Sequence, residues 1–164
     1  MRILNILLII SILFFYGCSK YEMYDWAIES NRNSANLELK DLKINYLNKE
    51  HSEVSVLVVD EETMSTLHSK HSGIDETTDV LTFDHGSDEH AVRADIAVCG
   101  DVALLESEKH NTTIQNELLL YILHGILHCC GFDDCDDESH QKIHAEEDRV
   151  LKAIGVGTVW SNVT

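Results

Sequence analysis

The segment most informative about the fold is TTIQNELLLYILHGILHCCGFDD, residues 112–134. Apolar side chains fill nearly every position from 118 to 127, which predicts a central buried helix over about 112–130. Thr112 and Gln115 have the spacing of a capping box, in which side chains satisfy the first free amides of a helix. Gly131 stands where a left-handed residue would end that helix. A helix this apolar requires other elements to cover it.

The rest of the chain supplies those elements. EVSVLVVD (53–60) is rich in valine and predicts a strand buried on both faces, and Asp60 can cap a helix that runs to about residue 70. The same patterns predict further strands at 23–30, 79–83 and 92–99, and further helices at 34–49, 101–109 and 136–154. We therefore expect an α+β domain in which a small mixed sheet of about four strands packs with helices.

Length and composition limit the classes of protein that fit. With 164 residues, of which 44% are hydrophobic and 25% charged, the chain has the size of one domain and the composition of a soluble globular protein. Its formal net charge is −17. This charge argues against a large basic surface as the main means of binding nucleic acid, although it does not exclude a local basic groove.

The cysteines predict a reducing compartment. Their number is odd, two of them are adjacent within the expected central helix, and no CxxC zinc spacing occurs. We interpret them as reduced residues that mostly fill the core, as in a cytoplasmic protein: Cys18, Cys99, Cys129, Cys130 and Cys135.

Residues 1–22 point in another direction. Their apolar run from Ile3 to Tyr16 has the length of a signal-peptide core and is short for a membrane span. Gly17 and Cys18 after it resemble a lipoprotein cleavage site, which would place the protein at a membrane or export it. The alternatives are a start of translation at Met23 and a buried element of the domain.

His124 and His128 form the first candidate functional site. Four residues apart on a helix, they project from one face and could hold one metal ion. After the turn at Gly131, Asp133 or Asp134 could supply a third ligand, which makes an open zinc site whose bound water would be the nucleophile. Burying two histidines among leucines is costly unless they are paired, so hydrogen-bonded core histidines are the alternative interpretation.

A second pair with the same spacing, His140 and His144, lies on the charged helix expected at 136–154. A solvated helix face is the simpler interpretation of this pair, because charged residues surround it.

Five segments resemble the YbeY family of metal-dependent endoribonucleases, which act in bacterial ribosomal RNA maturation. HGILHCCGFDD (124–134) resembles the family signature HGxLHxxGyDH, TTDVLTF (77–83) resembles PTDVLSF, and ADIAVC (94–99) resembles GDIVIS. VSVLVVDEETMSTLH (54–68) resembles the second strand and helix of the family, and HAEEDRVLKAIG (144–155) resembles its acidic last helix. The resemblance runs from about residue 23 to 159. It favours a single hydrolase domain at 23–164 with a zincin-like HxxxH metal site on its central helix.

The resemblance implies one Zn²⁺ per chain, bound by His124, His128 and Asp134. The family has a third histidine where Asp134 stands, and an aspartate would make the metal a weaker Lewis acid. A catalytic arginine of the family is replaced by Ser72, and Thr77 replaces a proline. His71 and Arg93 are the candidates that could compensate for the missing arginine, and the general base is unknown.

Four further acidic residues are candidates for supporting roles. Glu117 and Asp133 could hold the metal ligands through hydrogen bonds, although a glutamate that favours the start of a helix is the simpler interpretation of Glu117. Asp79 and Asp95 match family positions, but aspartates that open or line strands are more often structural.

The function that follows from the resemblance is a zinc-dependent, single-strand-specific endoribonuclease. It would act in maturation of the small-subunit ribosomal RNA 3′ end and in ribosome quality control, with ribosomal small-subunit proteins rather than DNA as partners. One alternative is a zinc peptidase, although Gly125 replaces the glutamate that such enzymes need as a base. The other is a non-catalytic, metal-stabilised factor bound to the ribosome.

Overall fold

The computed structural model describes residues 47, 49 and 51–160. The expected strand at 23–30 and the apolar segment 1–22 lie outside these residues, as does nearly all of the expected helix at 34–49. Within the described part of the chain, no helix is long and apolar enough to cross a membrane.

Three strands and four helices make up the described part, an α+β arrangement as predicted. The central strand β3 pairs in parallel with β1 and antiparallel with β2, so the sheet is mixed and has the order β1-β3-β2. Three strands are seen where about four were expected, since the remaining one was placed at 23–30. The bounds are β1 His51–Val59, α2 Glu61–Ser72, β2 Val80–Asp84, β3 Ala91–Cys99, α3 Gly100–His110, α4 Ile114–Cys129 and α5 Asp137–Ala153.

The strand that is most deeply buried is β3, and not β1. Among the side chains of β1 that the structure describes, only Val54 and Val56 are buried, while those at 52–53, 55 and 57–59 keep part or most of their surface exposed. The prediction that this strand is buried on both faces was therefore wrong. The physical reason is its position at one side of the three described strands, where α2 covers the second face only in part. Val59 packs beside the Met64 cluster, yet Leu57 and Val59 keep part of their surface exposed.

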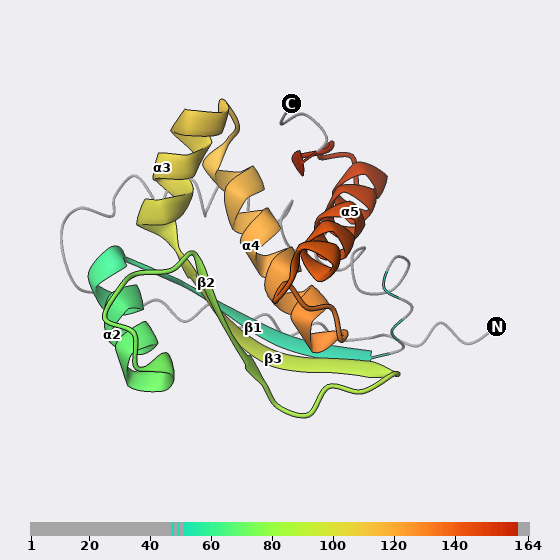
Figure 1. Ribbon diagram of the computed structural model, residues 1–164, viewed down its shortest axis with the longest axis horizontal. Coiled ribbons are helices and arrows are strands. Elements are labelled where there is room, and N and C mark those ends of the chain that lie inside the picture. The colour runs from blue at the N-terminus through green and yellow to red at the C-terminus, as the bar shows by residue number, and fades with distance from the viewer. Residues whose placement is uncertain (1–46, 48, 50, 161–164) are drawn as a thin grey trace.

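The apolar helix α4 crosses one face of the sheet, between α3 and α5 (Figure 1). Leu123, Ile126 and Leu127 on α4 are almost completely buried, and each such side chain contributes about 1.5–3 kcal/mol of transfer free energy. The N-cap of α4 is Thr113, whose hydroxyl accepts from the amide of Asn116 at 3.2 Å. The expected cap at Thr112 was thus one residue too early.

The other face of the sheet is covered by α2. Met64 of α2 is fully buried against Ala97 and Cys99, which alternate along β3 with the residues that face α4. Asp60 caps this helix as predicted, accepting from the amide of Thr63 at 2.8 Å. The sheet therefore separates the side chains around α4 from those around α2.

Candidate metal centre

The end of α4 is shaped by a glycine turn. Gly131 has a φ of 91°, and its amide donates to the carbonyl of His128 while the amide of Phe132 donates to that of Leu127. These two hydrogen bonds are the Schellman motif, which needs a left-handed residue at the glycine position. The chain reverses here, as predicted, and brings the side chain of Asp134 back beside the helix.

His124, His128 and Asp134 form a compact group of possible metal ligands. The Nε2 atoms of the two histidines are 2.9 Å apart. One oxygen of Asp134 is 3.7 Å from the Nε2 of His124, and the other is 3.9 Å from the Nε2 of His128. Two nitrogens bound to one tetrahedral zinc lie roughly 3.3 Å apart. The separations in this group therefore suit a single ion.

Hydrogen bonds at the far side of each ring fix which nitrogen is free. The Nδ1 of His128 is 3.1 Å from the carbonyl oxygen of Phe132, and the Nδ1 of His124 is 2.7 Å from the carboxylate of Glu147. Since both oxygens only accept, each Nδ1 carries the hydrogen and each Nε2 presents a lone pair. Two lone pairs that face each other at 2.9 Å repel, unless a metal ion binds both of them or one Nε2 carries a proton and donates to the other. The donor set therefore fits a metal ion.

The electrostatics around His124 favour a bound cation. Burial by itself lowers the pKa of His124, but the hydrogen bond and negative charge of Glu147 outweigh it, with smaller help from Asp79 and Asp134. The net effect is a pKa raised above the ordinary value of histidine. The same negative charges would stabilise a divalent ion in place of the proton.

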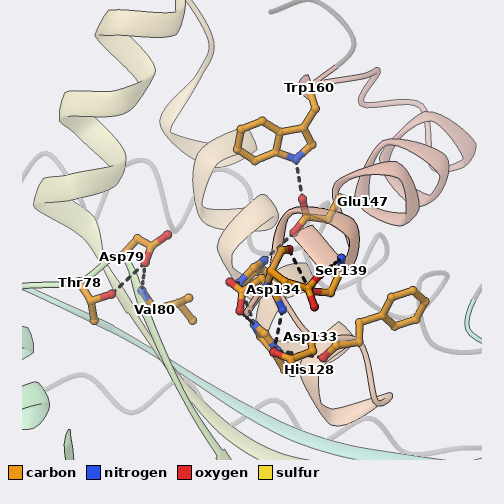
Figure 2. Close-up of polar contacts among 12 residues, drawn as sticks. Thr78, Asp79, Val80, His128, Asp133, Asp134, Ser139, Glu147 and Trp160 are labelled. Atoms are coloured by element: carbon orange, nitrogen blue, oxygen red, sulfur yellow. Dashed lines mark hydrogen bonds and ion pairs between the residues drawn. The ribbon is translucent and has the colours of Figure 1, made fainter. Parts of the chain in front are cut away.

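A pocket of about 450 Å³ opens beside these ligands. Across it from the histidines lies Asp79, whose carboxylate accepts from the amide of Val80 at 2.9 Å and the hydroxyl of Thr78 at 3.0 Å (Figure 2). Among the described residues, the lining includes no lysine or arginine. The full lining is Thr78, Asp79, Val80, Leu81, Thr82, Asp84, His124, His128, Cys129 and Asp134.

Comparison with known proteins decides the family. A family model described as "Endoribonuclease YbeY" matches residues 22–155, which is most of the chain. The chain belongs to the YbeY family.

Several curated relatives carry the name Endoribonuclease YbeY. The protein from Heliobacterium modesticaldum is 27% identical over 125 residues, which cover 68% of this chain and 75% of the relative. The protein from Macrococcus caseolyticus is 31% identical over 115 residues, which cover 65% of this chain and 75% of the relative. The solution structure of a Thermotoga maritima protein is 25% identical, covers 84% of this chain and 87% of that one, and superposes with a TM-score of 0.49.

His71 and Arg93, the two candidates to compensate for the arginine expected from the resemblance, lie away from the pocket lining. His71 of α2 contacts the ring of Phe83, 4.8 Å away between centroids, on the α2 side of the sheet. Arg93 donates to the carbonyl of Gly86 at 2.9 Å and pairs with Asp88 at 3.3 Å. Their catalytic roles stay predictions, and each would require the substrate to reach beyond the pocket.

The acidic residues named from the sequence have separate surroundings. Glu117 is buried and accepts from the hydroxyl of Thr112, and Asp95 is bonded to His85 at 2.8 Å. Asp133 faces its own loop, where hydrogen bonds from Cys135 and the amide of Asp134 hold its pKa below the usual range. Among the described residues, therefore, neither Glu117 nor Asp133 forms a hydrogen bond to His124 or His128.

Sequence reasoning missed Glu147, the residue that bonds to His124. A signal was present, because Glu147 falls on the inner stripe of α5 together with Ile143, Val150 and Leu151. A charged residue in such a stripe requires a buried partner.

The second histidine pair also differs from expectation. His140 is exposed as predicted, but His144 is half-buried and stacks on Trp160, with ring centroids 3.7 Å apart and planes 7° apart. A solvated face therefore describes only the first of the two.

Proposed function

We propose that this YbeY-family chain is a zinc-dependent endoribonuclease that cleaves single-stranded RNA, with ribosomal RNA as its substrate. The observation that supports the metal part is the pair of Nε2 atoms, 2.9 Å apart, beside the carboxylate of Asp134. The name of the curated relatives supports the RNA part. A zinc ion held by His124, His128 and Asp134 would activate water and polarise the scissile phosphate.

The charge of the pocket shapes how an RNA phosphate could bind. The described lining carries the carboxylates of Asp79, Asp84 and Asp134 and no basic side chain. An approaching phosphate would therefore depend on the metal for charge compensation more than on arginine or lysine. Asp79, held by Thr78 and Val80, is placed to exclude a second anion from its side of the pocket.

Peptide hydrolysis is a poorer fit to this geometry. A peptidase of the HxxxH type has a glutamate as base directly after the first histidine, and here that residue is Gly125. A Cβ at residue 125 would overlap the Thr82 hydroxyl, so the packing of α4 on β2 leaves no room for such a side chain.

We further propose that residues 23–164 form the catalytic unit, that it works in the cytoplasm, and that ribosomal small-subunit proteins are its partners. Maturation of the 3′ end of small-subunit ribosomal RNA and ribosome quality control are the processes we assign to it. The family model, which begins at residue 22, supports the first of these points. Removal of residues 1–22 should then leave RNA cleavage unchanged.

The test is cleavage of a single-stranded RNA by the full chain, with and without a zinc chelator. His128→Ala should abolish both zinc binding and cleavage, whereas His140→Ala, an exposed histidine of α5, should leave both intact. Cleavage that survives His128→Ala or chelation would rule out the metal-dependent nuclease. Zinc binding without RNA turnover would favour the non-catalytic alternative.

A further inference from the structure

Glu147 lies at the centre of a buried chain of hydrogen bonds that joins α4, α5 and the segment after α5. Its side chain is 0% exposed. One carboxylate oxygen is 2.7 Å from the Nδ1 of His124, and the other accepts from the indole Nε1 of Trp160 at 2.5 Å (Figure 2). Both oxygens of a fully buried acid are therefore satisfied by one ring on each side.

The direction of each hydrogen bond in this chain is set by its ends. An indole nitrogen can only donate a hydrogen bond, so one carboxylate oxygen of Glu147 accepts from Trp160. The other oxygen then accepts from the Nδ1 of His124, which keeps the hydrogen on Nδ1 and turns the lone pair of Nε2 toward His128 and Asp134. A single orientation of the His124 ring satisfies all these contacts.

We propose that Glu147 is a positioning residue that holds His124 in its metal-binding tautomer, and that Trp160 fixes Glu147 for this task. The inference rests on the proposed function, because it assigns these residues to the metal centre described above. It makes the segment that follows α5 a structural part of that centre.

The segment itself is anchored from two further sides. Asp148, the residue after Glu147, accepts from the backbone amides of Val159 at 2.7 Å and Trp160 at 3.0 Å. The ring of His144 stacks on the indole. These contacts keep the Nε1 of Trp160 directed at Glu147, so the hydrogen-bond chain has a rigid end.

Glu147→Gln is the decisive variant because it keeps the shape and removes one acceptor. Glutamine has one carbonyl oxygen and one amide group, so it can accept from only one of its two neighbours. Either the Trp160 bond is lost, or the amide donates to Nδ1 and moves the hydrogen of His124 to Nε2, which then cannot bind a metal. Loss of such a supporting hydrogen bond typically weakens metal affinity by about 10–100-fold.

The experiment compares the full chain with Glu147→Gln, Trp160→Phe and Glu146→Gln. The last variant makes the same chemical change one residue away, at a side chain that pairs with Arg149. Two quantities are measured for each protein, with circular dichroism as the check on folding. The first is the zinc dissociation constant, from competition with a chromogenic chelator. The second is the ¹⁵N shifts of the His124 ring without metal, which report its tautomer.

We expect Glu147→Gln to raise the zinc dissociation constant about 10–100-fold and to change the His124 ¹⁵N pattern. Trp160→Phe, which keeps an aromatic ring but lacks the N–H, should change the zinc dissociation constant and the ¹⁵N shifts in the same direction but by a smaller amount. Glu146→Gln should match the wild type in both quantities. Unchanged ¹⁵N shifts and affinity in folded Glu147→Gln would overturn the proposal.

Neither measurement uses RNA. A wild-type chain that shows the expected tautomer shifts but cleaves no RNA would refute the proposed function and leave this inference standing.

Discussion

Gly125 of α4 lies so close to Thr82 of β2 that a Cβ on the glycine would overlap the threonine hydroxyl. The Cδ1 atom of Ile96 in β3 would be 3.4 Å from the same Cβ. This contact brings the helix turn that carries His124 directly against β2, whose residues form the opposite wall of the pocket. The spacing of helix and strand at the metal centre therefore depends on the absence of a side chain at residue 125.

Gly125→Ala should destabilise the protein even though alanine favours helices. Alanine gains about 1 kcal/mol of helix propensity over glycine, while overpacking a tight contact costs typically about 1–3 kcal/mol. Urea unfolding of Gly125→Ala should show a lower free energy of unfolding.

Thr82→Ala provides the matched background for that measurement, because it removes the hydroxyl that the new methyl group would meet. In this background Gly125→Ala should be neutral or stabilising by up to about 1 kcal/mol. An equal loss in both backgrounds would show that the Thr82 contact is not the source of the strain.

Zinc should stabilise the fold through the His124, His128 and Asp134 group. A ligand that binds only the folded state at a free concentration 100 times its dissociation constant adds about 2.7 kcal/mol to the free energy of unfolding. We expect an increase of this size for the wild type and for His140→Ala, and none for His128→Ala. Thermal unfolding with and without zinc measures it, and equal shifts in the two histidine variants would contradict the site.

Zinc affinity should fall as the pH is lowered. Although burial lowers the pKa of His124, Glu147 outweighs it and the pKa is raised, so a proton competes with the metal already above the ordinary histidine pKa. In the metal-free protein this raised pKa stabilises the fold at low pH, and that contribution disappears as the pH rises through the raised value. Zinc titrations between about pH 5 and pH 8 should show the affinity rising with pH until the pH exceeds the raised pKa, and a flat profile would refute the assignment.

Ser72→Arg should raise the rate of RNA cleavage without changing zinc affinity. Residue 72 is the exposed last residue of α2 and stands where the family resemblance places a catalytic arginine. A single group that stabilises charge developing in the transition state typically raises the catalytic rate about 100- to 1,000-fold, which sets the upper limit of the gain in rate. Ser72→Gln, which is polar but uncharged, is the control. Equal rates in the two variants would show that a positive charge here does not reach the substrate.

The local elements of this protein could be predicted from its amino-acid sequence. The apolar run of α4, the valine-rich β1, the cap at Asp60 and the turn at Gly131 each follow from neighbouring residues, because periodicity and capping act over a few positions. The spacing of His124 and His128 likewise placed both rings on one face of a helix.

How those rings are held, and which side chains surround them, could be learned only from the folded structure. Glu147 bonds to His124 across 23 residues, and Trp160 reaches Glu147 from beyond the end of α5. Glycine is required at residue 125 because Thr82 of β2 packs against it, which the sequence of α4 does not reveal. Such contacts join residues that are distant in the chain, and no local sequence pattern predicts which partner a buried polar group will have. These partners become neighbours only when the chain folds, so their interactions cannot be inferred from local sequence.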